Sequence, residues 1–397
     1  MSNEWLREAG FETLTIREGL TPGFEQEHSD PIYATSSFVF ESAEQAAATF
    51  SGERDGNTYS RFSNPTVSVF EKRLAALEGG QEGVATSSGM AVILTLCLTL
   101  LRAGDHVICS RNVFGSTIGL FNNILTKKNI SVTFVALREL DDWRQAVTPN
   151  TKLFFCETPS NPLREVGNIR EITNIAHDSG ALLAVDNCFC TPALQRPLSL
   201  GADVVMHSAT KYLDCQGRVL GGALVGSEKL MAEARGFVRV CGPSMSPFNA
   251  WIFSKGLETL QLRMDVHSQR AQALAEWLET HPDVKKVNYC GLASHPDHAL
   301  AASQQSAFGG VLSFEVDGGR DTAWAFINAV RLMSLTANLG DVKTTVCHPA
   351  STTHGRLTDV QKQQGNITEG LIRIAVGLED LEDLKRDCER GFAAIST

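Results

Sequence analysis

Six apolar runs of strand length recur between residues 106 and 225, and longer stretches of helical character separate them. The runs are His106 to Cys109, Val132 to Val135, Leu153 to Glu157, Leu182 to Asp186, Val204 to His207, and Gly221 to Val225. Parallel strands need long crossover connections, usually a helix, and their sheets are covered on both faces. The alternation therefore predicts an α/β fold built on a mostly parallel sheet.

The pattern changes after Trp251. One long helical segment, Phe253 to Thr280, is followed by separated strands such as Val284 to Tyr289 and Gly310 to Val316. Helices and strands that segregate in this way are typical of an α+β unit. We therefore predict a smaller C-terminal α+β domain at 253–397.

The first sixty residues differ from both regions. They contain several Gly, Pro and Ser positions and little hydrophobic periodicity, which favours an extended conformation over a packed domain. We predict that residues 1–60 form an arm that contacts a neighbouring subunit, and that residues 61–252 form the large domain.

Composition narrows the class of protein. A chain of 397 residues with 43% hydrophobic content can bury a large core. The formal net charge is -10 and no Lys/Arg-rich block offsets it, so we predict neither nucleic-acid binding nor attachment to a membrane. The apolar stretch from Met90 to Leu101 is too short to span a bilayer, and the opening Met1 to Glu8 does not resemble a secretory signal. A cytoplasmic location is expected.

Ten cysteines are scattered along the chain without a CxxC pair, which predicts reduced thiols. Cys188 and Cys190 have no partner pair at zinc-like spacing. His348 and His354 lie six residues apart and do not share one helical face. No metal site is predicted.

A lysine follows the predicted strand that ends at His207. The sequence continues Ser208-Ala209-Thr210-Lys211, so two hydroxyls precede the amine. Partial burial would favour the neutral, nucleophilic form of Lys211, and the hydroxyls of Ser208 and Thr210 could hold a phosphate beside it. This combination suits pyridoxal phosphate, although a solvated lysine after a polar turn is the simpler alternative.

An aspartate ends the preceding strand. Asp186 is expected at the carboxyl edge of the sheet, where α/β proteins bind ligands. Its anionic form can keep a pyridine nitrogen protonated and so make the ring an electron sink. A helix-capping or turn role is the alternative for Asp186 alone. Because Lys211 lies one βα unit further along the chain, both side chains could face one ligand.

Two further segments could complete a cofactor site. Ser88-Gly89-Met90 precedes the apolar run Val92 to Leu101, and a helix starting there would direct free N–H groups at an anion. Ordinary capping is the alternative. Phe114 is a candidate to stack on a pyridine ring, with core packing the alternative.

These residues together resemble the Cys/Met-metabolism family of pyridoxal-phosphate enzymes over nearly the whole chain. The matching segments are Tyr59-Ser60-Arg61, Ser88-Gly89-Met90, Glu157-Thr158-Pro159-Ser160-Asn161-Pro162, Asp186-Asn187, Ser208-Ala209-Thr210-Lys211 and Gly370-Leu371-Ile372-Arg373. The resemblance implies the aspartate-aminotransferase fold (fold type I) and a homotetramer made of two tight dimers.

The resemblance also implies roles for single residues. Tyr59 and Arg61 would reach the cofactor phosphate of the neighbouring subunit. Asn161 would lie near the phenolic oxygen of the cofactor, and Arg373 would bind the substrate α-carboxylate. Lys211 would bond to the cofactor and act as general base and acid.

The finer resemblance is to the sulfhydrylase branch, whose members replace the succinate of O-succinyl-L-homoserine with sulfide to form L-homocysteine. The segments that carry it run from Lys211 to Gly222, from Gly242 to Trp251, and from Ala337 to Thr344, where Asn338 replaces the serine of many relatives. Cystathionine γ-synthesis, sulfhydrylation of the O-acetyl ester and γ-elimination on the same scaffold are alternatives. A non-catalytic binding protein is the remaining class.

Three residues depart from wider family patterns. Phe114 stands where many relatives have a tyrosine, so only the stacking role carries over. Ser116 occupies the place of a reactive cysteine in methionine γ-lyases, which argues against that activity. Cys215 replaces an expected glycine; an inert side chain is the simpler interpretation, and a redox-sensitive thiol requires that it be accessible.

The succinyl group carries a second carboxylate that needs a partner. Arg356, just beyond the sulfhydrylase-like segment, is the first candidate, and Arg111 is the second. A surface salt bridge is the alternative for either arginine. The expected substrates are therefore O-succinyl-L-homoserine and sulfide.

Overall fold

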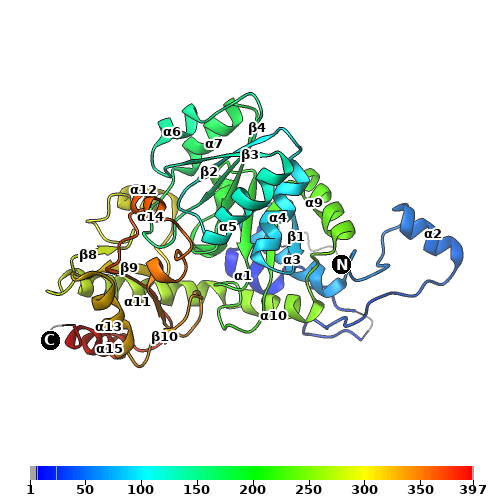
Figure 1. Cartoon of the computed structure of the whole chain (residues 1–397). Helices are drawn as coiled ribbons and strands as arrows, with labels where there is room; N and C mark the ends of the chain where they lie inside the picture. Colours follow the sequence, from blue (N-terminus) through cyan, green and yellow to red (C-terminus); the bar gives the residue numbers. More distant parts are fainter. Residues whose placement is uncertain (1–5, 7, 24, 396–397) are drawn as a thin grey trace.

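A seven-stranded sheet forms the centre of the described chain, which in this computed structural model comprises residues 6, 8–23 and 25–395 (Figure 1). Its strand order is β1-β7-β6-β5-β4-β2-β3. The strands are β1 (Glu82–Thr86), β2 (His106–Ser110), β3 (Ser131–Val135), β4 (Thr151–Glu157), β5 (Leu182–Asp186), β6 (Val204–Ser208) and β7 (Gly222–Gly226). Most of the opening segment Met1 to Glu8, on which the expectation about a secretory signal rests, lies outside the described residues.

The predicted parallel sheet is confirmed. Strands β2 to β6 pair in parallel, and the six predicted runs lie in strands, apart from Gly221, which precedes β7 by one residue. Strand β7 is antiparallel to both β6 and β1. The sequence prediction missed β1, because its Glu-Gly-Val-Ala-Thr sequence lacks the apolar run that marks the other strands.

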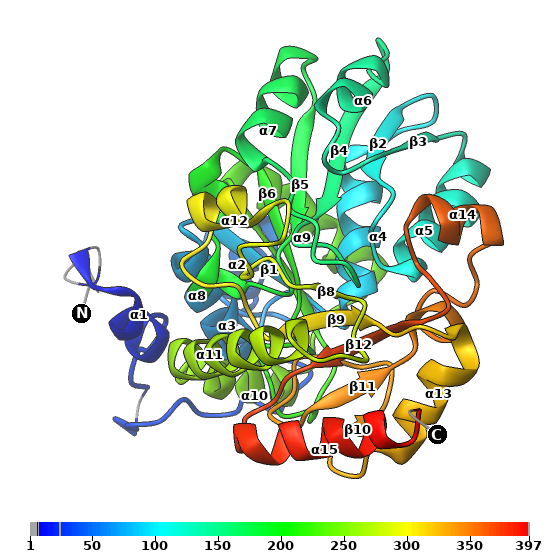
Figure 2. The same ribbon diagram turned by 90° about the vertical axis from the view of Figure 1, so that its left-hand side faces the viewer.

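Alternate residues of the central strands enter different cores. In β4, Leu153 and Phe155 pack in one cluster, and Phe154 and Cys156 pack in another. This follows from the two-residue period of a strand, which directs successive side chains to opposite faces. Helices α4 (Gly89–Leu100) and α9 (Glu228–Cys241) cover the first face, and α6 (Leu140–Gln145) and α7 (Ile169–Asp178) cover the second (Figure 2).

A second, five-stranded sheet lies in the described C-terminal part of the chain, with strand order β10-β11-β12-β9-β8. Its strands are β8 (Lys286–Asn288), β9 (Val311–Glu315), β10 (Ser334–Leu335), β11 (Thr345–Cys347) and β12 (Leu371–Ala375). Its core shares one cluster with α11 (Leu260–Glu279), α13 (Gly319–Ala329) and α15 (Leu381–Ala393). The remaining helices include α5 (Gly115–Leu120), α8 (Thr191–Leu194), α12 (His298–Gln304) and α14 (Asp359–Gln364). The α/β architecture with a smaller α+β unit is as predicted, and the boundary at 252 stays a prediction.

The prediction of one helix from Phe253 to Thr280 is wrong. The segment contains the end of α10 (Pro247–Leu257) and then α11, with Thr259 in a non-helical conformation between them. Helix α10 packs on α3 (Pro65–Glu78), whereas α11 continues to the second sheet, so one straight helix cannot serve both contacts. Arg263 donates to the carbonyl of Gly256 at 2.5 Å and so satisfies an oxygen at the end of α10.

The N-terminal segment leaves the body of the molecule. Helix α1 (Phe11–Arg17) packs on α3, but α2 (Ala43–Ser51) lies well away from both sheets (Figure 1). Val39, on the way to α2, is 99% exposed. An apolar side chain so exposed on an extended segment fits the predicted arm, whose contact with a neighbouring subunit stays a prediction.

The length and hydropathy of the helices bear on whether any of them could span a membrane. Within the described residues, none is both long enough and apolar enough to cross a bilayer.

The approach of α10 to the loop after Lys211 generates a stability prediction. A Cβ atom on Gly256 would lie 2.3 Å from the carbonyl oxygen of Leu213, so a Gly256→Ala variant has to move the helix or the loop. We expect it to lower the free energy of unfolding by about 1–3 kcal/mol. The midpoint of denaturant unfolding of the purified protein measures this.

Gly236 in α9 provides a matched control, because a Cβ there meets no atom within 4 Å. Gly236→Ala is expected to raise the unfolding free energy by about 0.5–1 kcal/mol, since alanine is the better helix former. Equal unfolding midpoints for the two variants would contradict the close packing of α10 on the Lys211 loop.

Candidate active site

A cavity of about 320 Å³ opens at the carboxyl ends of β4, β5 and β6. It brings together most of the residues that the sequence singled out. They are Ser88, Gly89, Met90, Phe114, Asn161, Asp186, Ser208, Thr210, Lys211, Asn338 and Arg373. Their segments are far apart in the sequence, and the parallel sheet and β12 assemble them at one edge.

Lys211 lies just after β6, in the turn that the sequence predicted. Its Nζ donates to Oδ1 of Asn338 at 2.5 Å, which links the lysine to the loop before β11. Burial is the main cause that lowers the pKa of Lys211. The amine therefore loses its proton more easily than a solvated lysine does, as a nucleophile requires.

Two residues with carboxyl groups lie next to each other on adjacent strands and line the same cavity as the lysine. Asp186 ends β5 and is paired in register with Glu157, which ends β4. Burial raises the pKa of Asp186, and burial together with the charge of Asp186 raises the pKa of Glu157 well above its usual range. Asp186 accepts from the backbone N–H of Cys188 at 3.0 Å, and Glu157 accepts from that of Phe114 at 2.9 Å.

Glu157 was missed as a candidate site residue, although the sequence contained the signal. The strand that predicted Asp186 has a neighbour that also ends in a carboxylate, and parallel neighbours end at the same edge of a sheet. Thr353, which lines the cavity from an irregular segment, carried no comparable signal.

The start of α4 forms one wall of the cavity. Ser88 caps the helix, because its hydroxyl accepts from the backbone N–H of Ala91 at 3.2 Å. The first N–H groups of a helix have no acceptor within it and favour an anion in front of them. Gly89 permits the close approach of this wall to the lysine segment, since a Cβ there would lie 2.7 Å from Cβ of Ser208.

Arg373 comes from the central strand β12 of the second sheet and is 1% exposed. Its guanidinium donates to Oδ1 of Asn161 at 3.3 Å and to the carbonyls of Ala337 and Asn338 at 3.0 and 3.2 Å. Its Nε is buried without a partner in the described chain. The group is thus a buried cation held by neutral oxygens, at the wall of a cavity.

Phe114 differs from the core residues around it. Its side chain belongs to the cavity wall and the residue is 40% exposed, whereas core phenylalanines such as Phe121 and Phe155 are fully buried. This exposure argues against the core-packing alternative and leaves the ring free to stack on a planar ligand.

Three predicted residues lie elsewhere. Tyr59 and Arg61 do not line the cavity; Arg61 contacts the carbonyl of Arg239 and the ring of Phe62. Arg356 is exposed in the segment before α14 and lines neither the Lys211 cavity nor the one beside it. Their assignments to the site stay predictions.

Cys215 is fully buried, so the structure favours the inert side chain over an accessible redox thiol. Its φ is +57°, a backbone conformation that glycine adopts more easily. Its Sγ lies 3.1 Å from Nε2 of His267, whose Nδ1 is 2.7 Å from the carbonyl of Val376. Because Nδ1 must carry the proton that the carbonyl accepts, Nε2 accepts from the thiol.

This contact joins the Lys211 loop to the second sheet through α11. Burial lowers the pKa of His267 to about 4, so the imidazole is neutral near pH 7 and can donate one hydrogen bond through Nδ1 while it accepts another at Nε2. The side-chain hydrogen bond provides a physical reason for a cysteine where glycine would be less strained.

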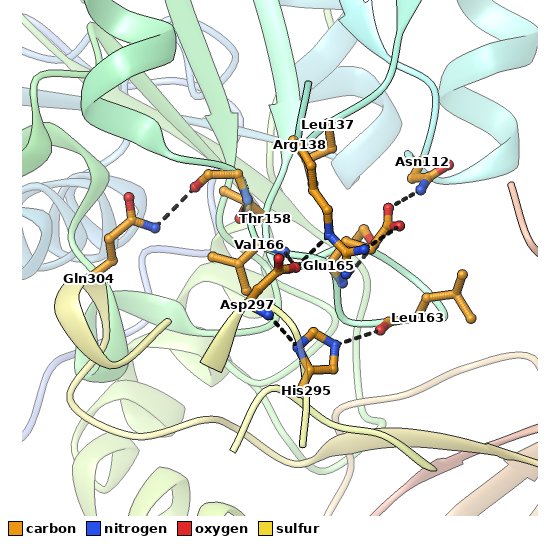
Figure 3. Close-up of polar contacts among 12 residues, drawn as sticks. Asn112, Leu137, Arg138, Thr158, Leu163, Glu165, Val166, His295, Asp297 and Gln304 are labelled. Atoms are coloured by element: carbon orange, nitrogen blue, oxygen red, sulfur yellow. Dashed lines mark hydrogen bonds and ion pairs between the residues drawn. The ribbon is translucent and has the colours of Figure 1, made fainter. Parts of the chain in front are cut away.

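A polar network holds the segment that carries Asn161 (Figure 3). Arg138 donates to Asp297 at 2.7 Å and pairs with Glu165 at 3.5 Å. Asp297 also accepts from the backbone of Val166 at 2.8 Å, and Glu165 accepts from Asn112. The network therefore fixes the 160–168 segment against the residues that precede α12.

The arrangement fits pyridoxal phosphate. Cavities of this size are typical of small-molecule sites. A protonated ring nitrogen would supply the cation that the buried Asp186 lacks, and the start of α4 with Ser208 and Thr210 would hold the phosphate. Lys211 would hold the aldehyde carbon, with Phe114 against the ring.

The comparisons with known proteins place the chain in a family. The model of the Cys/Met metabolism PLP-dependent enzymes matches residues 12–393. The chain belongs to this family, and its cofactor is pyridoxal phosphate.

Individual relatives narrow the comparison. The chain is 57% identical to an O-succinylhomoserine sulfhydrylase of Pseudomonas aeruginosa, over 98% of this chain and 97% of the relative. It is 41% identical to an L-methionine gamma-lyase of Pseudomonas putida, over 97% and 98% of the two chains. A cystathionine gamma synthase from Xanthomonas oryzae pv. oryzae, solved with aminoacrylate and cysteine, superposes with a TM-score of 0.93 at 36% identity, over 98% of this chain and 99% of that chain.

The contact between Cys215 and His267 can be tested with two substitutions. Cys215→Ala leaves Nε2 of His267 buried and without its donor, so we expect a loss of about 1–3 kcal/mol in unfolding free energy. Cys215→Gly loses the same contact but relieves the backbone, and its loss should be smaller by about 1 kcal/mol. Denaturant midpoints measure both; an alanine variant as stable as the parent would contradict the contact.

Proposed function

We propose that the chain catalyses the reaction of O-succinyl-L-homoserine with sulfide to form L-homocysteine and succinate, an O-succinylhomoserine sulfhydrylase activity in methionine biosynthesis. The observation that carries the proposal is the 57% identity to the Pseudomonas aeruginosa enzyme of that name over 98% of the chain. Ser116 adds support, because methionine γ-lyases are expected to carry a reactive cysteine at this place.

Arg373 positions the substrate in this proposal. A buried guanidinium without a carboxylate partner binds the α-carboxylate of an amino acid with charge and a planar set of donors. Asn161 accepts from the same guanidinium, so it holds the arginine in place while its own position is fixed by the network around Glu165.

Lys211 moves the protons. Its amine, with a pKa lowered by burial, takes a proton from Cα and then one from the β-carbon, which lets succinate leave from Cγ. After the sulfur of sulfide bonds to Cγ, the amine returns one proton to the β-carbon and one to Cα. When bound, pyridoxal phosphate delocalises the negative charge that develops at the substrate Cα. Asn338, 2.5 Å from the amine, orients Lys211 for these transfers.

A second copy of the chain completes the site in this proposal. Tyr59 and Arg61 do not line the cavity of their own chain, and they follow the extended segment whose helix α2 lies well away from both sheets. We propose that they reach the phosphate in a neighbouring subunit, within a homotetramer of two dimers.

All ten cysteines are free, which supports a reducing cytoplasmic location.

A panel of substrates tests the reaction. Sulfide or cysteine is offered with the O-succinyl or O-acetyl ester of L-homoserine, and homocysteine, cystathionine and 2-oxobutyrate are quantified. We expect homocysteine from the succinyl ester and sulfide. The Lys211→Ala variant should lose about 10²- to 10⁴-fold in kcat, and it should also lose the visible absorption of the lysine-bound cofactor. Cystathionine or 2-oxobutyrate as the main product would reject the sulfhydrylase in favour of another activity on this scaffold.

Mixed dimers test the shared site. Lys211→Ala and Arg61→Ala subunits with different tags are co-expressed, and random pairing then makes half of the dimers mixed. If Arg61 acts in the neighbouring subunit, each mixed dimer has one intact site, and the total activity is about a quarter of that of the parent. The control pairs Lys211→Ala with Asp186→Asn, which leaves no intact site. Equal activity in both mixtures would mean that Arg61 does not act across the interface.

A further inference from the structure

A second cavity, of about 200 Å³, lies beside the Lys211 cavity. Asn161 lines both cavities. Thr117 and Thr353 line the first, and their chain neighbours Ile118 and His354 line the second. The two cavities therefore share a wall at the residue that contacts Arg373.

Arg111 supplies the positive charge of this second cavity. It is the only lysine or arginine among the lining residues in the part of the chain that the structure describes. Its backbone N–H donates to the carbonyl of Val135 at 2.8 Å, which places it at the ends of β2 and β3. The side chain is half-buried, and within the described residues its guanidinium has no carboxylate or carbonyl partner.

The neighbouring carboxylate is already engaged. Glu165 accepts from Asn112, the residue after Arg111, and pairs with Arg138, which in turn binds Asp297 (Figure 3). Arg138 is shared between the two carboxylates, and within the described residues no ion pair joins either of them to the guanidinium of Arg111. The charge of Arg111 is left for an anion that comes from outside the protein.

The other ionisable wall residue does not compete for that anion. His354 is 3% exposed, and burial, with the nearby Arg373, lowers the pKa of its imidazole to about 4. It is neutral near pH 7. Arg356, two residues further on, is exposed and does not line the cavity.

We propose that this second cavity is the subsite for the succinyl group, with Arg111 paired to its distal carboxylate. The inference rests on the proposed function and deepens it. An extended diacid ester has one carboxylate at each end. Arg373 and Arg111 provide one guanidinium in each of two adjoining cavities, and Asn161 separates them. The planar guanidinium matches a carboxylate with two parallel hydrogen bonds.

The acetyl ester provides the test, because it lacks the distal carboxylate. The holoenzyme and its Arg111→Gln variant are assayed with sulfide and each ester. We expect kcat/KM for the succinyl ester to fall about 10- to 100-fold, as for loss of a charged hydrogen-bonded pair, and kcat/KM for the acetyl ester to change less than about twofold.

Two further variants sharpen the result. Arg102→Gln, at an exposed arginine after α4, is the matched control and should leave the ratio of the two kcat/KM values unchanged. Arg356→Gln tests the competing assignment. An equal loss for both esters in Arg111→Gln, no loss for either, or a selective loss in Arg356→Gln would overturn the inference. A parent enzyme that makes no homocysteine from either ester would instead overturn the proposed function.

Discussion

The buried charge of Arg373 is the constraint on which the site depends. The guanidinium is almost fully removed from solvent, and in the described chain it is held by the oxygens of Asn161, Ala337 and Asn338 rather than by a carboxylate. A buried cation without a counter-charge is costly unless a ligand supplies one. Because Arg373 comes from the second sheet and Asn161 from the segment after β4 of the first sheet, the same contact also holds the two sheets together around the cavity.

The parallel strands position the acidic residues and the lysine of the site. Their shared carboxyl edge gathers Glu157, Asp186 and Lys211 from segments that lie far apart in the sequence. Burial shifts the pKa of both acids upward and that of the amine downward, because it disfavours the charged form of each group. A site of this kind favours a ligand that brings its own charges, as a phosphorylated pyridine does.

Much of this arrangement could be predicted from the sequence, because buried parallel strands are continuously apolar and the polar residues that end them are conspicuous. Lys211 and Asp186 were found in this way. The break between α10 and α11 could not be, since it depends on two separate packing surfaces. Nor could sequence spacing choose between Arg111 and Arg356, because the difference between them is exposure and the shape of a cavity.

The single residue shared by the two cavities has an evolutionary consequence. The groups that move protons in the reaction cavity come from the strand ends, whereas the second cavity is walled by the segments around Arg111 and His354, whose neighbours Thr117 and Thr353 line the reaction cavity. Substitutions in these segments can retune which leaving group is accepted without altering the groups that move protons. Only Asn161 belongs to both sets among the described residues. The preferred leaving group can therefore change during evolution while the residues that transfer protons stay the same.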